Sequence, residues 1–168
     1  MDTKDEAEFR EFVASCGSRL LRTAFLLTGD RGHAEDLVQL ALERTARRWS
    51  GLAGSPEAFA RTVLLHAATD RWRRRRARVQ EVFDDVHEPS IADGVDQLLL
   101  RRDLVAALQQ LPSQQRAALV LRYFLDLSEK ETARELDISV GTVKSAVSRA
   151  LDRLRTLVPA DLNQEAYR

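Results

Sequence analysis

The sequence predicts an all-α protein built from two small helical domains that a flexible acidic linker joins. Apolar residues recur at the three- and four-residue spacing of amphipathic helices through most of the chain. Glycine and proline are scarce, at 7 and 4 residues, and most of them stand at expected boundaries between helices. Residues 79–96 lack helical spacing and carry an acidic block, so we interpret them as the linker. We expect domains at residues 1–78 and 97–168, the second a four-helix domain that contains a helix-turn-helix.

The composition limits the class of protein. Hydrophobic residues make up 44% of the 168 residues and charged residues 31%, which suffices for folded cores. Cys16 is the single cysteine, so no internal disulfide can form. The N-terminus is charged and lacks the apolar stretch of a signal peptide, and no apolar run approaches the ~18 residues that span a bilayer. We expect a cytoplasmic protein without direct membrane insertion.

Three helices are expected in the first domain, and each has a recognisable start or end. Gly29 can close the first helix in a left-handed conformation. Asp30 can cap the second. Ser55 and Pro56 have the residue types of an N-cap and a first helical position, and they start the third. The expected ranges are Glu6–Thr28, about 31–49 and about 56–76.

The second domain shows four further helices with comparable signals. Pro112 breaks the first of them, and Ser113 is a candidate N-cap for the next. Ser128 and Glu131 have the spacing of a capping box, in which two side chains satisfy each other's free backbone amides. Ser139 can cap the last helix. The expected ranges are Asp93–Leu111, about 114–124, Glu129–Leu136 and about Val140–Val158.

The last two helices predict a helix-turn-helix. They are separated by the short turn Asp137–Ser139, and the small Ala133 lets them approach closely. Long donors and short polar groups lie on one side of the last helix, as a recognition helix in a DNA major groove requires. The alternative is an ordinary surface helix. The candidate DNA contacts are Thr142, Lys144, Ser145, Ser148 and Arg149, and the inward positions are Val143, Val147, Ala150, Leu151 and Leu154.

Arginine dominates the end of the third helix, where six of the eight residues of Arg71–Arg78 are arginine. The helix dipole favours some positive charge at this end, but phosphate contact explains a run of this length better. Trp72 fits a base or sugar contact and a core position equally well. The small-residue loop Trp49–Ser55 is either a simple connector or a holder for an extruded base. The candidate contacts in this domain are Arg61, Arg71, Trp72, Arg73, Arg74, Arg75 and Arg76.

The charges are balanced overall but segregated along the chain. Lys and Arg total 26, as do Asp and Glu, so the formal net charge is zero. No basic residue lies between Val79 and Leu100, where six acidic residues occur. Opposed blocks of this kind suggest that DNA contact is local and conditional on a partner.

Eight short segments, in this order and at these spacings, together resemble the extracytoplasmic-function (ECF) sigma factors of the sigma-70 family. The most similar branch is the actinobacterial SigE-like group, and the resemblance covers nearly the whole chain. The segments are Leu20-Leu-Arg-Thr-Ala-Phe-Leu-Leu-Thr-Gly-Asp30, Ala34-Glu-Asp-Leu-Val-Gln39, Pro56-Glu-Ala-Phe, Asp70-Arg-Trp-Arg-Arg, Leu111-Pro-Ser-Gln-Gln-Arg-Ala, Val120-Leu-Arg-Tyr-Phe, Leu127-Ser-Glu-Lys-Glu-Thr-Ala and Ser139-Val-Gly-Thr-Val-Lys-Ser145.

The resemblance implies a division of labour. The first domain would bind core RNA polymerase and open the promoter −10 element, the second would bind the −35 element as duplex DNA, and the linker would thread through the polymerase. Asp36, Leu37 and Gln39 match the polymerase-binding stretch. Family members commonly have glutamate where this chain has Leu40, so a polar clamp contact is missing or replaced there. An anti-sigma protein is an expected partner, and no cofactor, metal or small-molecule substrate is implied.

Other functions remain open on the sequence alone. A helix-turn-helix regulator of another type would explain residues 112–158, but not the Asp-Leu-Val-Gln segment with the arginine run. A helical interaction module fits only if that run is a solvated face. We do not expect an enzyme, because the three histidines lie far apart without metal-binding spacing and no phosphate loop or nucleophile motif occurs.

Overall fold

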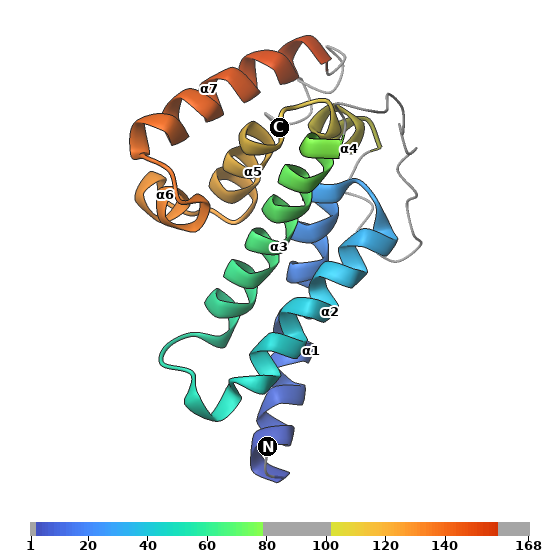
Figure 1. Cartoon of the computed structure of the whole chain (residues 1–168), viewed down its shortest axis with the longest axis vertical. Coiled ribbons are helices and arrows are strands. Elements are labelled where there is room, and N and C mark those ends of the chain that lie inside the picture. The colour runs from blue at the N-terminus through green and yellow to red at the C-terminus, as the bar shows by residue number, and fades with distance from the viewer. Residues whose placement is uncertain (1–2, 79–101, 158–168) are drawn as a thin grey trace, which may run out of the picture. The chain divides into compact units, whose positions relative to one another are not determined.

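The computed structural model describes residues 3–78 and 102–157, and for residues 71–78 it describes the backbone alone. Every regular element in these two ranges is a helix, as Figure 1 shows, which confirms the predicted all-α class. The chain divides into two compact units, residues 1–86 and 87–168, and each has its own apolar core. The predicted linker, residues 79–96, lies outside the described residues.

The first unit is a bundle of three long helices, α1 (Thr3–Thr28), α2 (Arg31–Arg47) and α3 (Pro56–Arg78). Each helix packs against the other two, and the three lie side by side in Figure 1. Their facing sides are apolar, because removing such side chains from water is the main favourable term in folding. Buried members of this core include Cys16, Ala24, Leu27, Ala41, Leu64 and Leu65.

Local capping contacts set the ends of these helices and confirm three predicted boundaries. Gly29 has a φ of 68° and closes α1 with a backbone hydrogen bond of 2.7 Å. The Asp30 carboxylate accepts a hydrogen bond from the His33 N–H at 2.8 Å. Ser55 Oγ accepts one from the Ala58 N–H at 3.3 Å. Each contact satisfies a backbone group that the first or last helical turn leaves without a partner.

The connection from α2 to α3 differs from the predicted one. α2 ends at Arg47 rather than near Trp49, because Trp49–Gly51 wind into a separate 3₁₀ turn, η1. A 3₁₀ turn is tighter than an α-helix, and it redirects the chain sooner than continued α-helix would. After the loop, α3 continues to Arg78, beyond the predicted end near Arg76.

The second unit contains α4 (Arg102–Gln109), α5 (Ser113–Leu119), α6 (Glu129–Leu136) and α7 (Val140–Leu157), with a π-helical turn, η2 (Val120–Phe124), after α5. α5 and α6 both pack against α7. The predicted helix at 93–111 is described only from residue 102 onward, and the predicted last residue, 158, is also outside the described range. The core of this unit includes Val105, Leu108, Ala117, Leu121, Val143 and Ala150.

One predicted cap is wrong. Ser113 is the first residue of α5, and Pro112 occupies the N-cap position without a side-chain hydrogen bond. The Pro112 carbonyl accepts the Arg116 N–H at 3.0 Å, so the first helical bond already starts there. Proline cannot donate a backbone hydrogen bond and has a fixed φ, which makes it suited to this position. The helix therefore begins one residue earlier than a serine cap would allow.

The end of α5 holds a turn that the sequence does not predict. Val120–Phe124 form a π-helix whose closing N–H···O bond of 3.1 Å spans five residues. Asp126 follows in the left-handed conformation, with a φ of 52°. The Arg122 guanidinium donates to the Leu127 carbonyl, and this hydrogen bond links η2 to the residue before the N-cap of α6. The chain reaches the start of α6 through these irregular but hydrogen-bonded residues.

A buried arginine joins α4 to α5. Arg116 is 8% exposed and donates to the backbone carbonyls of Leu108, Gln109 and Leu111 at 2.8, 3.0 and 3.0 Å. It also donates to the Gln109 side-chain oxygen at 2.6 Å. The carbonyls of Leu108 and Gln109 lie at the end of α4, where the helix leaves carbonyls without a partner of its own, and that of Leu111 lies just beyond it. The Leu108 carbonyl also accepts the Leu111 N–H at 3.1 Å. Burial lowers the pKa of Arg116 to about 10, so the guanidinium stays charged at neutral pH.

Candidate nucleic-acid interface

α6 and α7 form the predicted helix-turn-helix. Ser128 Oγ accepts from the Glu131 N–H at 3.2 Å, and the Glu131 carboxylate accepts from the Ser128 N–H at 2.8 Å, which confirms the capping box. Asp137 closes α6 in the left-handed conformation, with a φ of 53°, which Asp tolerates better than most residues. Ser139 Oγ then accepts from the Thr142 N–H at 3.1 Å and starts α7.

The faces of α7 separate apolar from polar residues. Val143, Ala146 and Ala150 are buried, and Ala146 is a core position that the sequence reasoning missed. Thr142 is half-buried, and its hydroxyl lies 2.8 Å from Ser139 Oγ. The predicted inward residues Val147, Leu151 and Leu154 are half-buried. The exposed side chains include four of the predicted DNA contacts, Lys144, Ser145, Ser148 and Arg149.

Some of these exposed side chains already have partners within the protein. Lys144 Nζ lies 3.6 Å from a carboxylate oxygen of Glu129, which stands at the start of α6. Ser145 Oγ donates to the Thr142 carbonyl at 3.0 Å. Arg149 forms no ion pair within residues 3–78 and 102–157. Sequence reasoning missed Glu129, because its partner lies on another helix.

The predicted DNA contacts of the first unit all lie on α3. Arg61 is half-buried within this helix. Residues 71–76 belong to its last turns, where the backbone is described and the side chains are not. All seven predicted contact residues therefore lie on one helix, and their contacts with DNA stay predictions. They are Arg61, Arg71, Trp72, Arg73, Arg74, Arg75 and Arg76.

Aromatic side chains anchor the start of the loop between α2 and α3. The Trp49 ring meets the Phe9 ring edge-on, with 5.2 Å between centroids, and lies 5.3 Å from the Phe12 ring. Contacts of this geometry are favourable beyond simple burial. The Arg48 guanidinium lies 5.7 Å from the centre of the Phe59 ring. The Trp49 ring thus packs against α1 and holds the first end of the loop in place.

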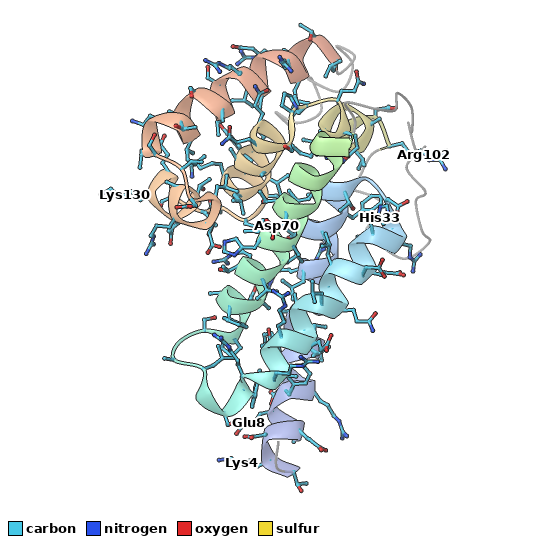
Figure 2. All side chains as sticks on the ribbon, in the orientation of Figure 1. Lys4, Glu8, His33, Asp70, Arg102 and Lys130 are labelled. Carbon is cyan, nitrogen blue, oxygen red and sulfur yellow. The ribbon has the colours of Figure 1, made fainter. Side chains whose placement is uncertain are left out.

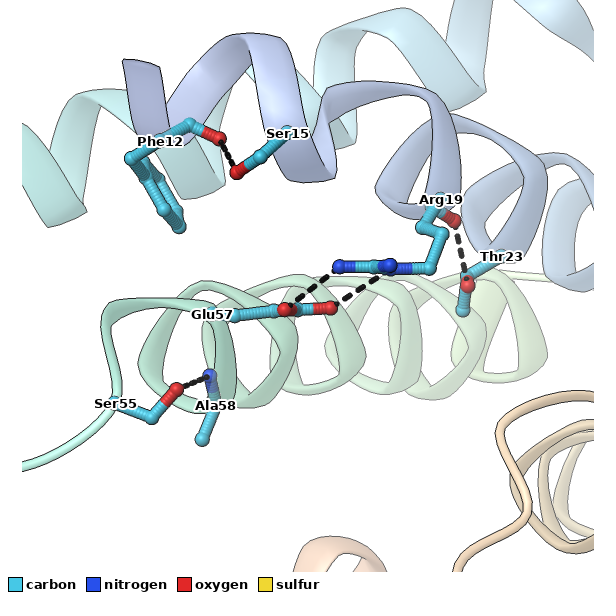
Figure 3. A network of polar contacts seen from close by, with 7 residues as sticks. All are labelled: Phe12, Ser15, Arg19, Thr23, Ser55, Glu57 and Ala58. Carbon is cyan, nitrogen blue, oxygen red and sulfur yellow. Dashed lines mark hydrogen bonds and ion pairs between the residues drawn. The ribbon is translucent and has the colours of Figure 1, made fainter. Parts of the chain in front are cut away.

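An ion pair fastens the other end of the same loop, as Figure 3 shows. Arg19 of α1 donates from Nε and Nη2 to the two carboxylate oxygens of Glu57, at 3.0 and 2.9 Å. Two parallel hydrogen bonds fix the relative orientation of the groups. Glu57 lies in the first turn of α3, where the helix dipole also favours a negative charge. α1 therefore positions the start of α3.

The predicted polymerase-binding residues lie on α2 in different environments. Asp36 and Gln39 are exposed, and Leu40 is half-buried. Leu37 is 6% exposed and belongs to the core of the bundle. A buried leucine holds the helix in place rather than offering a side chain at the surface. The surface of the predicted stretch therefore consists of the carboxylate and the amide.

An apolar groove runs between α1 and α2, and Gln39 lies on its edge. Its volume is about 510 Å³. Its lining is mainly apolar, and the sequence alone did not predict it because four of its ten lining residues come from α1 and six from α2. The apolar lining residues are Phe9, Val13, Gly17, Leu21, Val38, Leu42 and Ala46.

A row of polar side chains on α2 borders this groove. Arg31 and Glu35 form an ion pair at 2.6 Å, and Glu43 and Arg47 form another at 2.5 Å. Gln39 lies midway between the two pairs, in the same row of residues spaced by four. The charges on either side of Gln39 are thus balanced within the helix.

Comparison with known sequences identifies the family. The family described as Sigma-70 region 2 matches residues 12–78, and the one described as Sigma-70, region 4 matches residues 101–154. An RNA polymerase sigma-E factor from Streptomyces avermitilis is 39% identical over 163 residues, covering 95% of this chain and 90% of that protein. An ECF RNA polymerase sigma factor, SigF, from Caulobacter vibrioides is 35% identical over 155 residues, covering 89% and 85%.

A solved structure supports the same assignment. The sigma factor RpoE from Bartonella quintana, crystallised with the anti-sigma factor NepR, superposes with a TM-score of 0.74 at 28% identity, covering 92% of this chain and 98% of that one. The chain therefore belongs to the ECF sigma factors, which are RNA polymerase sigma factors of the sigma-70 family. Sigma factors are transcription initiation factors, and this chain shares that function.

Two further observations concern the described residues only. No group of three or more His, Cys, Asp or Glu side chains within residues 3–78 and 102–157 is arranged to hold a metal ion. No helix in the same ranges has the length and apolar character to cross a membrane.

Proposed function

We propose that this sigma factor contacts the −35 element through the exposed face of α7. The observation that carries the proposal is that Lys144, Ser145, Ser148 and Arg149 are exposed while the opposite side of the helix is buried. Lysine and arginine can donate to guanine edges, and hydroxyls suit phosphates or base edges. The start of α7 also presents backbone N–H groups and the positive end of a dipole to a phosphate.

We assign the −10 element to α3 and to the loop before it. The arginines near the end of α3 suit phosphate contact, because guanidinium groups neutralise backbone charge. The loop Trp49–Ser55 is held at both ends by contacts with α1, through Trp49 and through the pair of Arg19 with Glu57. A pocket for an extruded base needs such a preformed frame. The predicted contacts are Arg61, Arg71, Trp72, Arg73, Arg74, Arg75 and Arg76.

We assign core RNA polymerase to the surface of α2. Asp36 and Gln39 are exposed there and supply polar contacts, while the buried Leu37 holds the helix in place. The groove beside Gln39 offers apolar surface to the same partner. Leu40 is half-buried and does not line the groove. It stands at the position where relatives commonly have glutamate, so no carboxylate is offered to the polymerase there.

An anti-sigma protein is a further proposed partner, by analogy with RpoE of Bartonella quintana, whose structure contains NepR. The proposal requires no cofactor, metal or small-molecule substrate and no enzymatic activity. It implies a protein of the cytoplasm, where core polymerase and promoter DNA are present.

In vitro transcription tests the proposed function. Core RNA polymerase without a sigma factor is given a library of randomised promoters, with and without the full chain. Promoter-dependent transcripts should appear only when the chain is added. A helix-turn-helix regulator of another type would yield none without a separate sigma factor, and that result would overturn the proposal.

A further inference from the structure

We propose that Glu129 sets the strength of the −35 contact by competing with DNA for Lys144. The inference rests on the proposed role of α7, because Lys144 matters here only if it meets DNA. The observation behind it is the ion pair between α6 and α7, in which Lys144 Nζ lies 3.6 Å from Glu129 Oε2. The structure thus assigns an acidic neighbour to a predicted DNA contact.

Both members of this pair lie at the surface. The Lys144 side chain is 64% exposed and the Glu129 side chain 40% exposed. Lys130, labelled in Figure 2, is exposed beside Glu129 on α6. Exposed pairs contribute little to fold stability. The carboxylate is therefore not needed to hold α6 against α7. Its larger effect is on the affinity of Lys144 for DNA.

The position of Glu129 makes the competition direct. It is the first residue of α6, where the helix dipole stabilises a negative charge. A DNA phosphate or guanine edge that approaches Lys144 meets an ammonium whose charge this carboxylate already partly neutralises. The carboxylate also repels phosphates nearby. Glu129 thus lowers the affinity of the helix-turn-helix for DNA without contacting a base.

The test compares two near-isosteric variants that each remove one negative charge, so both have the same net charge. Glu129→Gln frees Lys144, whereas Asp152→Asn removes a carboxylate from the exposed side of α7 that pairs with Arg155 at 2.9 Å and not with Lys144. Holoenzymes made from core polymerase and each full chain are titrated with a promoter duplex that the wild-type holoenzyme selects from a randomised library. Thermal unfolding of each chain checks that the fold is unchanged.

Glu129→Gln should bind the duplex about two- to fivefold more tightly at low salt, the range that exposed ion pairs span in double-mutant cycles. The slope of log affinity against log salt should steepen by up to about 0.9, since one more lysine then displaces counterions. Asp152→Asn should give a clearly smaller gain. With Lys144→Met already present, Glu129→Gln should gain no more than Asp152→Asn does.

Two results would overturn the inference in different ways. Equal gains for Glu129→Gln and Asp152→Asn, with Lys144→Met still weakening binding, would show a general charge effect and leave the proposed role of α7 standing. No loss from Lys144→Met would contradict the Lys144 contact and the inference with it, but not the contacts proposed for the rest of α7. Failure of the wild-type holoenzyme to select any duplex would contradict the proposed function itself.

Discussion

Arg116 shows at the scale of one residue how a charged side chain can complete the end of a helix. Its guanidinium donates to three backbone carbonyls and one side-chain oxygen from the end of α4. Water cannot replace it easily, because the residue is 8% exposed. A buried acceptor that loses its donor keeps the full cost of its desolvation.

Replacing Arg116 with methionine keeps a long side chain but removes every donor. We expect Arg116→Met to lower the free energy of unfolding of the second unit by about 2–4 kcal/mol, since three backbone carbonyls each lose a donor that water cannot easily replace. Urea unfolding of the full chain, followed by circular dichroism, measures the change. The exposed Arg134→Met is the matched control and should stay within about 0.5 kcal/mol of wild type. Equal stability of the two variants would contradict this role.

Cys16 offers a second test at the residue scale. It is 1% exposed, and burial, followed by the charge of Glu57, raises its pKa above 9.0, although Arg19 acts in the opposite direction. The folded state therefore favours the neutral thiol, and the thiolate is the reactive form. A thiol reagent at pH 8 should label the native chain far more slowly than the chain unfolded in urea. Rapid labelling of the native chain would show that the first unit opens readily.

The same shift has a consequence for stability at alkaline pH. In the unfolded chain the thiol loses its proton near its ordinary value of 9.0, while the folded thiol keeps its proton to higher pH. Below pH 9 the contribution of Cys16 to stability is fully present. As the pH rises from 9 through the folded pKa, that contribution is lost.

At the scale of the element, α7 divides into a buried side and an exposed side, and the exposed side contains the residues that would read DNA. Arg149 forms no ion pair among the described residues, so it is available to a base edge. Lys144, by contrast, is paired with Glu129. The two basic residues should therefore respond differently to substitution and to salt.

We expect Arg149→Ala to cost about 1–3 kcal/mol at one base pair of the −35 element, the value of a good bidentate contact. Holoenzyme affinities measured on single-base variants of a selected promoter test this, because the variant should lose its preference at that position only. Arg153→Ala, exposed on the same helix, is the control and should bind with unchanged preference. An equal loss on every sequence would mean that Arg149 contacts phosphate alone.

At the scale of the whole molecule, zero net charge limits what the chain can do alone. With 26 basic and 26 acidic residues, it lacks the general positive field that attracts DNA from a distance. On the proposed assignment, the basic residues at the end of α3 and on α7 would contact DNA locally. Core polymerase would supply the remaining affinity by presenting both units to one promoter at once.

A gel shift at fixed salt tests this dependence. The free chain should bind a selected promoter weakly, and addition of core polymerase should produce a specific complex at much lower chain concentration. Core polymerase alone, and the chain with DNA of scrambled sequence, are the controls. Tight, sequence-specific binding by the isolated chain would contradict the prediction.

Most short-range features of the fold were predictable from the sequence, and the cap predicted at Ser113 is an exception. The caps at Asp30, Ser55 and Ser139 join groups within three residues, so the local sequence contains both partners. Ser113 has the right residue type, but Pro112 before it already starts the helix. The π-helix after α5 has no residue signature of its own. Local patterns thus locate most helices and some of their ends.

The sequence by itself determined the helical class, the helix-turn-helix and the exposed residues of α7, because helical periodicity and capping depend on neighbours within a few positions. Only the tertiary structure decided which residues meet across helices. The pairs Arg19 with Glu57 and Lys144 with Glu129, and the groove between α1 and α2, join separate elements. Their geometry depends on how helices pack, and no spacing along one helix encodes it.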